Sequence, residues 1–395
     1  MKQWHHHEKN QTYKWGRSNQ PIPYSAEKSN MPFSISVLPG DKNNVGPVIG
    51  ILTSTRKGLP FIGNMETFTR LIRYVHERAG FAYVFCPQND TSVMNGFTYD
   101  YKRDCWFAIK APLPDVVYNR IPSPEMEATR EYAQMIERLE SEGIPFFNRS
   151  FFSKWDVYLL LNDNPLIKSF LPETRLISSP YMLKDLLKDF NRIIIKPILS
   201  SKGSGVTLLE QNEQHTINAF SNKQQNTFNH VYEAWHALAL KPYSFIIQPY
   251  VSRKAYKSKP FDYRILVQKV KESWSVTGYG IRCSGPDMLT THVPSGGSLL
   301  SPQIAPLDEN RLDVIAHEIG TTVDEALGPV SEFSIDLGVD DDNQYWIFEV
   351  NSKPMVFDED HIRIEAEKRW FLHVLEISGY TSQDINPFPF THTIQ

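Results

Sequence analysis

The chain has 395 residues, of which 41% are hydrophobic and 22% are charged. This composition is typical of a globular protein and excludes a disordered or fibrous chain. At roughly 150 residues per domain, the length predicts two or three domains. Lysine and arginine total 41 against 45 aspartates and glutamates, so the formal net charge is −4. Because no run of basic residues is long enough for a nucleic-acid-binding surface, we expect no nucleic-acid partner.

The cysteines and the apolar runs indicate the compartment. Cys86, Cys105 and Cys283 lie far apart without paired spacing, which argues against a disulfide framework or a cysteine zinc site and fits a reducing compartment. No apolar run approaches the roughly 18 to 20 residues that span a bilayer. Residues 1–10 are polar and hold no apolar signal core. We therefore expect a cytoplasmic protein with no membrane partner.

The first part of the chain reads as a small α/β domain. Residues 1–44 are polar, without periodicity, and predict a partly mobile segment with one edge strand at 33–38. The strand–helix–strand pattern that follows is typical of a βαβ unit. The domain is expected over 45–148, with strands at 45–53, 81–86, 106–109, 116–120 and 144–147 and helices at 66–79 and 125–142.

The second part alternates strand hairpins with helices, which predicts an α+β domain over 149–385 and a tail over 386–395. Short elements at 167–170, 174–177 and 182–189 alternate helix and strand. Helices are expected at 154–161, 229–240, 310–326 and 360–377, and strands at 192–197, 205–209, 244–249, 262–270, 273–282, 332–338 and 344–351.

The hairpin at 332–351 carries the strongest chemical signal. If its turn is centred near Asp342, Asp336 lies almost opposite Glu349, and Asn351 follows two residues later. Two carboxylates opposite each other on a sheet repel, and oxygen donors of this kind suit Mg²⁺. We expect a magnesium site here. A solvated polar face on an exposed hairpin is the alternative, and the acidic run at 340–342 is expected to be a solvated turn.

Simple alternation also predicts which side chains of the second strand share a face. Trp346, Phe348 and Val350 are expected on the apolar side, and Ile347 is expected on the polar side together with Glu349. The apolar sets of both strands would then pack together behind the polar one.

A small-residue loop follows the apolar strand at 192–197, which ends in Lys196. Gly203 and Gly205 would let the backbone approach a ligand closely and point N–H groups at phosphate oxygens. The loop contains neither a phosphate-binding P-loop nor a dinucleotide-binding glycine motif. A plain hairpin turn remains the alternative.

Two further segments fit a nucleotide site less specifically. The strand near 245–251 stops at Pro249, where free backbone groups could pair with a purine edge, or where a core strand simply ends. Arg264 shares a face with Asp262, and Arg282 would lie near Asp262 across the hairpin. The two arginines could clamp a phosphate, or Arg282 and Asp262 could form an ordinary ion pair. The segment 292–298 could close over a bound ligand.

Taken in order, these elements resemble the ATP-grasp superfamily over residues 145–357, with FEVNSKP as the most specific motif. The chain is most similar to the spore-coat-associated YheC/YheD group of endospore-forming bacteria, through VVYNRIPS, FFNRSFFSKWDVYLLL, LPET, SKGSGV and FDYRILVQ. This resemblance implies an α+β fold in which two subdomains grip ATP. A small α/β pre-ATP-grasp domain would precede them.

The resemblance also implies roles for individual residues. Lysines and the small-residue loop would contact the phosphates of ATP, the strand end would flank the adenine, and arginines would stabilise the transferred phosphoryl group. The implied nucleotide contacts are Lys154, Lys196, Ser201, Lys202, Gly203, Ser204, Gly205, Gln248, Tyr250 and Val251; the implied catalytic residues are Arg264 and Arg282; the implied Mg²⁺ ligands are Asp336, Glu349 and Asn351. One departure is that 292–297 lacks the asparagine that many ATP-grasp ligases carry there.

The implied activity is a Mg-ATP-dependent carboxylate–amine ligase that forms an acyl phosphate, acting on a spore-coat-related peptide or amino acid. Alternatives are a non-catalytic, ATP-binding or structural spore-coat protein, and a kinase of a hydroxyl group. The expected partners are ATP, a carboxylate, an amine and spore-coat proteins, and the protein would be cytoplasmic or coat-associated. Arg120 of the first domain would either reach the substrate or form a salt bridge between domains.

Overall fold

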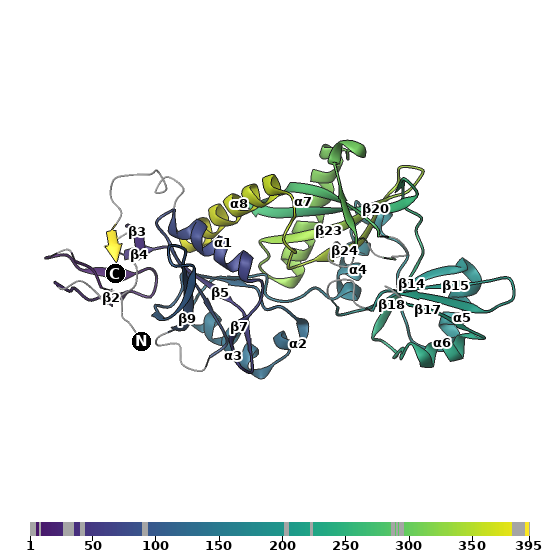
Figure 1. The fold of residues 1–395 in the computed structure, drawn as a ribbon, viewed down its shortest axis with the longest axis horizontal. Helices are drawn as coiled ribbons and strands as arrows, with labels where there is room; N and C mark the ends of the chain where they lie inside the picture. The colour runs from purple at the N-terminus through teal and green to yellow at the C-terminus, as the bar shows by residue number, and fades with distance from the viewer. Residues whose placement is uncertain are drawn as a thin grey trace. The chain divides into compact units, whose positions relative to one another are not determined.

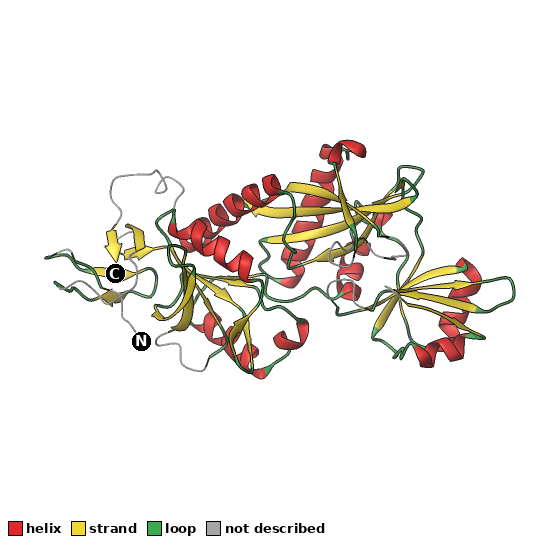
Figure 2. Cartoon of the chain, in the orientation of Figure 1, coloured by secondary structure: helices red, strands yellow, loops and turns green. Residues whose placement is uncertain are grey.

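The computed structural model describes residues 5–7, 9–26, 35–39, 44–88, 94–200, 205–221, 224–285, 289, 291, 296–380 and 392–394 (Figures 1 and 2). The chain divides into two compact units. Unit 1 comprises Met1–Ser150, Lys269–Glu272 and Arg363–Gln395, and unit 2 comprises Phe151–Gln268 and Ser273–Ile362. No helix in the described part of the chain is long and apolar enough to cross a membrane. The finer domain boundaries expected from the sequence stay a prediction.

A six-stranded sheet in the order β10-β9-β8-β5-β11-β12 forms the centre of unit 1. Its strand β5 runs parallel to both β8 and β11, and all five of its residues are buried, as expected for a strand covered on both faces. The strands are β5 (Val48–Leu52), β8 (Phe81–Phe85), β9 (Met94–Asp100), β10 (Cys105–Ala111), β11 (Val116–Asn119) and β12 (Phe146–Phe147).

Helices cover both faces of this sheet. The helix α1 (Met65–His76) and the unit 1 part of α8 (Asp360–Ser378) pack on one face, and α3 (Arg130–Ser141) packs on the other. The single helix expected at 125–142 is instead two, α2 (Pro124–Glu127) and α3. The reason is local: Thr129 has an extended backbone, and its side chain accepts a hydrogen bond from the Tyr132 N–H as an N-cap.

The N-terminal segment contains strands that the sequence pattern did not indicate. The strands β1 (Tyr13–Trp15) and β2 (Gln20–Ile22) join β3 (Ile35–Pro39), β4 (Asn44–Gly46) and β25 (His392–Ile394) in a sheet ordered β2-β1-β4-β3-β25. The side chains of Tyr13 and Trp15 are buried. Three-residue strands are too short for a periodic signal, which is why the sequence pattern did not indicate β1 and β2. A separate hairpin pairs β6 (Ser54–Arg56) with β7 (Leu59–Ile62).

Unit 2 contains two six-stranded sheets. We call the first the N-terminal sheet; its order is β13-β18-β14-β15-β16-β17, and every pairing in it is antiparallel. Helices α5 (Pro180–Phe190) and α6 (Val231–Ala237) pack on it through leucine and tryptophan side chains. Its strands are β13 (Arg175–Leu176), β14 (Arg192–Pro197), β15 (Thr207–Gln211), β16 (Ile217–Ser221), β17 (Gln224–Phe228) and β18 (Phe245–Pro249).

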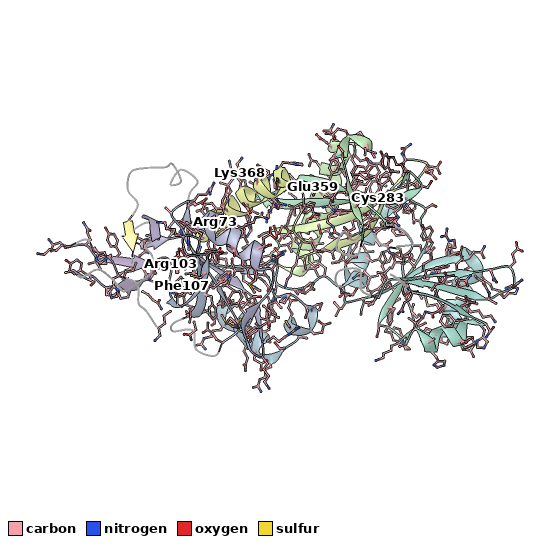
Figure 3. The ribbon with its side chains drawn as sticks, in the orientation of Figure 1. Arg73, Arg103, Phe107, Cys283, Glu359 and Lys368 are labelled. Atoms are coloured by element: carbon pink, nitrogen blue, oxygen red, sulfur yellow. The ribbon has the colours of Figure 1, made fainter. Side chains whose placement is uncertain are left out.

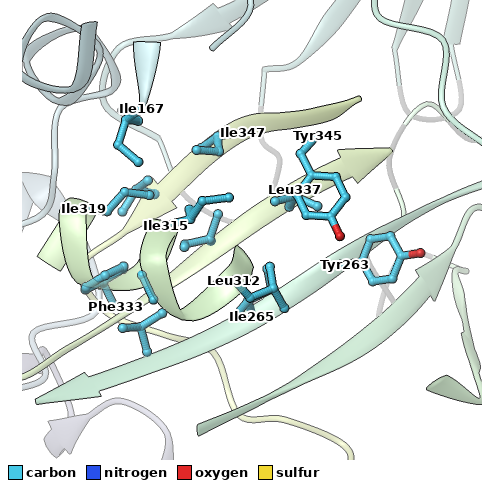
Figure 4. Close-up of a cluster of buried hydrophobic side chains, with 14 of the residues drawn as sticks. Ile167, Tyr263, Ile265, Leu312, Ile315, Ile319, Phe333, Leu337, Tyr345 and Ile347 are labelled. Atoms are coloured by element: carbon cyan, nitrogen blue, oxygen red, sulfur yellow. The ribbon is translucent and has the colours of Figure 1, made fainter. Parts of the chain in front are cut away.

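We call the second the C-terminal sheet; its main path is β22-β21-β20-β23-β24, and β19 (Ala255–Tyr256) pairs with β20. Helix α7 (Glu309–Leu327) packs on the apolar face of this sheet, as Figure 4 shows. Helix α4 (Lys154–Asp163) adds Val157 and Leu161 to the same core. The short 3₁₀ helices η2 (Lys168–Phe170) and η4 (Pro302–Ile304) belong to the same unit. The remaining strands are β20 (Lys259–Val270), β21 (Ser273–Cys283), β22 (Ser298–Leu300), β23 (Glu332–Val339) and β24 (Tyr345–Asn351).

The hairpin of β23 and β24 has the expected register at its carboxylates, because Asp336 is the partner of Glu349. The faces expected for the neighbouring residues Ile347 and Phe348 of β24 are wrong. The register shifts between Asp336 and Leu337, so Leu337 pairs with Ile347 and leaves Phe348 as an extra residue. Ile347 therefore enters the buried core, and Phe348 is only partly buried. A pattern of alternating residues does not reveal one inserted residue.

Candidate active site

Lys154 joins the two sheets of unit 2 at the start of α4. Its backbone N–H donates to the carbonyl of Ile198, just past β14. Its Nζ donates to the carbonyl and the hydroxyl of Ser200, each at 3.1 Å. The same Nζ lies 3.3 Å from Oε1 of Glu349 on β24. A single ammonium group thus bridges the loop after β14 and the carboxylate of the C-terminal sheet.

Lys196, on β14, is buried, with 8% of its surface exposed. Its Nζ donates to Oε1 of Gln248 at 2.8 Å and to the carbonyl of Phe348 at 3.3 Å. Gln248 in turn donates to the hydroxyl of Thr174 at 2.8 Å. Burial lowers the pKa of Lys196 to about 8, although the carboxylate of Glu349 opposes the shift. The ammonium is therefore held in a place where a nearby anion would favour its charged form.

The carboxylates of the hairpin face cations rather than water alone. Arg264 Nε lies 3.0 Å from Oδ1 of Asp336, and its Nη2 donates to Oδ2 at 3.5 Å. Asp336 raises the pKa of the Arg264 guanidinium. Asn351 Nδ2 donates to Oδ2 of Asp336 at 3.4 Å, so its amide oxygen is directed elsewhere. We call this set the charged face; its members are Lys154, Lys196, Arg264, Asp336, Glu349 and Asn351.

The charged face fits a hard cation by its chemistry. The carboxylates of Asp336 and Glu349 stand opposite each other, and carboxylate oxygens are donors suited to Mg²⁺. The Asn351 amide lies beside them with its nitrogen toward Asp336. In the described part of the chain, no group of three or more histidine, cysteine, aspartate or glutamate side chains could hold a metal ion. Any metal here would therefore depend on Asn351, water and ligand oxygens as well as the two carboxylates.

Arg282 and Asp262 are not paired with each other as the sequence suggested. Arg282 donates to both carboxylate oxygens of Glu359, at 2.6 and 3.0 Å. Asp262 accepts a hydrogen bond from Arg253 at 2.9 Å and from the Thr291 hydroxyl at 2.7 Å. Burial raises the pKa of Asp262, and Arg253 opposes that shift. The cross-strand ion pair, which was one of the two alternatives, is wrong: Asp262 pairs with Arg253 and Arg282 pairs with Glu359.

Arg253 is a residue that the sequence reasoning missed. Its guanidinium carbon lies 6.0 Å from the centre of the Phe348 ring, and Lys196 Nζ lies 5.8 Å from the same centre. Two cations therefore lie near one aromatic side chain. The positive charge of Arg253 also contributes to the lowered pKa of Lys196. The β-bulge of the β23–β24 hairpin, in which Phe348 is the extra residue opposite the step from Asp336 to Leu337, makes these contacts possible because it turns Phe348 out of the core. The only local signal was a basic pair, Arg253 and Lys254, just past a strand end.

The small-residue loop after β14 is described only at its end. Ser201, Lys202, Gly203 and Ser204 lie outside the described residues. Gly205 has a φ of +76°, and a Cβ there would lie 2.7 Å from Cγ of Pro197, so glycine is needed where the two ends of the loop meet.

The end of β18 packs against the start of β14. The Tyr250 N–H donates to the carbonyl of Arg192 at 3.0 Å. The Arg192 guanidinium carbon lies 4.0 Å from the centre of the Tyr250 ring. Val251 follows and is partly buried. Of the segment expected to close over a ligand, residues 292–295 lie outside the described part, and Gly296 and Gly297 lie within it.

Arg120 of unit 1 lies just after β11. Its Nη1 donates to the hydroxyl of Tyr118 at 3.2 Å. The neighbouring Asn119 is buried and bonds the backbone carbonyls of Asn148 and Arg149, at 3.1 and 2.9 Å. These contacts organise the end of the parallel strands. The role of Arg120 toward a substrate stays a prediction.

The sheets, the bridging lysine and the charged face together define an ATP-grasp protein. A sequence model of the YheC/D-like ATP-grasp family matches residues 143–380. The chain therefore belongs to the YheC/D-like ATP-grasp family. It is similar to the endospore coat-associated protein YheD of Bacillus subtilis, with 27% identity over 337 residues that cover 79% of this chain and 73% of YheD. It is also 24% identical to the endospore coat-associated protein YheC of the same organism, over 67% of this chain and 77% of YheC.

Solved structures share the fold. D-alanyl-alanine synthetase A from Vibrio cholerae matches with a TM-score of 0.53 and 12% identity, over 85% of this chain and 98% of that one. A carboxyaminoimidazole ribonucleotide synthase from Aspergillus clavatus, complexed with ATP, matches with a TM-score of 0.50 and 13% identity, over 87% and 78%. At these identities the likeness shows the fold alone. The α+β ATP-grasp fold and the YheC/YheD resemblance expected from the sequence are confirmed.

Proposed function

We propose that the protein is a Mg-ATP-dependent ligase that joins a carboxylate to an amine through an acyl phosphate. The observation that carries the proposal is the charged face, where Lys154, Lys196 and Arg264 surround Asp336 and Glu349 on facing parts of unit 2. Phosphoryl transfer requires positioning and charge neutralisation more than covalent help from the protein. Lysine, arginine and oxygen donors suffice for both.

In the proposed reaction, a carboxylate oxygen of the substrate attacks the γ-phosphorus of ATP. The bond from that phosphorus to the β,γ-bridging oxygen breaks, and ADP leaves with the electron pair. The amine nitrogen then attacks the acyl carbon, a C–N bond forms, and the C–O bond to the phosphoryl group breaks. Inorganic phosphate leaves, and the nitrogen loses one proton. Both steps are transfers without oxidation or reduction.

The residues of the charged face would divide this work. Lys154 and Lys196 would bind phosphate oxygens, and the strand end at Gln248, Tyr250 and Val251 would hold the base. Arg264 and Arg282 would balance the charge of the phosphoryl group as it moves. The residues that would hold Mg²⁺ are Asp336, Glu349 and Asn351, and the bound ion would supply neutralisation of the phosphate charge.

The names of the two relatives support a further part of the proposal. YheD and YheC are both described as endospore coat-associated. We therefore propose that the substrate or the partner of this protein belongs to the spore coat. A structural coat protein that keeps the fold without turnover is the second candidate, because the relatives' names describe association and no reaction.

Phosphorus NMR on the purified full chain tests these candidates together. The protein would be incubated with Mg-ATP and mixtures of amino acids and short peptides that supply the carboxylate and the amine. A ligase would give equal amounts of ADP and inorganic phosphate that depend on both components. A phosphate ester instead of free phosphate would identify a kinase of a hydroxyl group. Bound ATP without turnover on any mixture would favour the structural candidate.

A further inference from the structure

The segment that follows β24 crosses the face of β21 on which Arg282 lies. Phe357, Glu359 and Ile362 each contact this face at a different position along β21. The guanidinium carbon of Arg282 lies 5.6 Å from the centre of the Phe357 ring. Glu359, labelled in Figure 3, binds both terminal nitrogens of Arg282.

Two glycines on β21 make room for this segment. A Cβ built on Gly280 would clash with Oε1 of Glu359 and with Nη1 of Arg282. A Cβ built on Gly278 would lie 2.8 Å from Cγ1 of Ile362, which is fully buried. Neither glycine has a positive φ. Glycine is therefore needed at these two positions because a side chain would not fit there, and not because the backbone is unusual. The segment 357–362 fills the space that a side chain would occupy.

The ion pair is shielded from water. Arg282 has 3% of its side-chain surface exposed and Glu359 has 13%. Asp358 is a weaker neighbour, with Oδ2 3.7 Å from Arg282 Nη2 and about half of its side chain exposed. A two-pronged arginine–carboxylate pair fixes the plane of the guanidinium as well as its position. A single hydrogen bond would leave that plane free to rotate.

From this geometry we infer that Glu359 is a positioning residue that holds the Arg282 guanidinium in place for the transferred phosphoryl group. This inference rests on the proposed function, since it takes the role of Arg282 from there. Because only residues 352–356 separate the segment 357–362 from the strand that carries Glu349 and Asn351, the same stretch of chain would set the metal ligands and the arginine relative to each other.

The experiment compares two probes on the full-length protein. Mg-ADP reports nucleotide binding, and Mg-ADP with aluminium fluoride mimics a phosphoryl group during transfer. Glu359→Gln keeps the shape and removes the charge. We expect it to lose about 10²-fold in affinity for the aluminium fluoride complex, as for a misplaced catalytic group, with little change for Mg-ADP alone. Asp341→Asn, on the exposed turn between β23 and β24, is the matched control and should change neither.

A double variant separates positioning from a merely structural role. If Glu359 acts through Arg282, then Glu359→Gln adds no further loss to Arg282→Gln for the aluminium fluoride complex. Glu359→Asp, which retains the carboxylate, should recover part of the affinity. Gly280→Ala should reproduce the loss because it pushes the pair apart, and it provides the test if Glu359→Gln does not fold.

Two results would overturn the inference while leaving the proposed function intact. One is a folded Glu359→Gln variant with wild-type affinity for the aluminium fluoride complex. The other is full additivity of the Glu359→Gln and Arg282→Gln losses. A folded wild-type protein that binds neither probe would overturn the proposed function and this inference with it.

Discussion

The two sheets of unit 2 differ in how they treat charge. The ion pairs of the N-terminal sheet are exposed to solvent, as in Arg175 with Glu173 and Arg192 with Glu210. Its one buried ammonium, Lys196, is held by neutral acceptors, an amide and a backbone carbonyl. Among the described residues, the C-terminal sheet and the segment before it instead hold arginine–carboxylate pairs with limited exposure, those of Arg253, Arg264 and Arg282.

This difference separates two tasks. A buried lysine without a directly bonded carboxylate has a positive charge available for an anion that arrives from solution. Burying an arginine–carboxylate pair costs free energy of desolvation. The attraction between the two charges offsets much of that cost only when their hydrogen bonds are well aligned. Such pairs give fixed positions. Under the proposed function, the N-terminal sheet would bind the polyanion, and the C-terminal sheet would orient the reacting groups.

The largest effect on stability should come from breaking a pair in the C-terminal sheet. Arg264→Gln leaves the Asp336 carboxylate partly buried without its arginine, and should lower the free energy of unfolding by about 3 kcal/mol. The matched change in the N-terminal sheet is Arg175→Gln, which should cost less than about 1 kcal/mol because the pair is exposed. Urea unfolding of both variants measures the contrast. Equal losses would remove the distinction between the sheets.

A second change tests whether the bulge shapes the charged face. A Cβ on Gly338 would clash with the ring of Phe348, so Gly338→Ala should force that ring out of place at a cost of about 1 to 3 kcal/mol. Since the carbonyl of Phe348 accepts from Lys196, the affinity for Mg-ATP should fall too. Unfolding and calorimetric titration measure the two effects. Unchanged affinity in the destabilised variant would show that the bulge serves packing alone.

The pH dependence of binding should report on Lys196. Its pKa is lowered to about 8 by burial, and a bound phosphate would raise it again. The affinity for Mg-ATP should therefore be greatest below pH 8 and should fall as the pH rises through 8, by up to about tenfold per pH unit.

Lys196→Arg provides the control for this titration. Arginine keeps its charge over the whole range, so any binding that the variant retains should vary less with pH. The stability of the ligand-free protein should change in the opposite direction. Between pH 8 and 10.5 the unfolded state binds more protons at Lys196 than the folded state, so the free energy of unfolding should rise with pH. A fall over this interval would contradict the burial effect.

The smallest effect is expected at the acidic turn of the β23–β24 hairpin. Asp341 is exposed, so Asp341→Asn should change the free energy of unfolding by less than about 0.5 kcal/mol. Asp340 differs from it, because its side chain accepts from the Trp346 indole at 2.7 Å and from the backbone N–H of Gln344 at 2.9 Å. Asp340→Asn should be the more destabilising of the two by thermal unfolding. The reverse order would mean that the turn is not held by these hydrogen bonds.

Much of the fold could be predicted from local pattern. The strand at 192–197 is found with the expected bounds, because a short β-branched run between turn signals has one simple reading. The pairing of Asp336 with Glu349 was also correct, since the turn length fixes the register. The strand β17 escaped detection because four of its five residues are polar and exposed, and β16 did so because its alternation of buried and partly buried residues spans only five positions.

The parts of the site that could not be predicted depend on long-range contacts. Glu359 meets Arg282 across 77 positions of sequence. Its motif, FDED, resembles an ordinary acidic loop. The partner of Asp262 is Arg253, which lies beyond a strand end where no periodic rule applies. The extra residue Phe348 stands among consecutive apolar residues, Trp346 and Ile347, so sequence alternation gave it the wrong face. Tertiary packing decided each of these.

Calorimetric titration of Mg-ATP into the wild-type protein and into Glu349→Ala tests the central claim most directly. We expect the wild type to bind with a dissociation constant between about 1 mM and 1 μM, which corresponds to roughly 4 to 8 kcal/mol. The variant should show no binding, while Asp341→Asn should bind as the wild type does. Absence of binding by the folded wild type, or unchanged affinity in Glu349→Ala, would contradict the account.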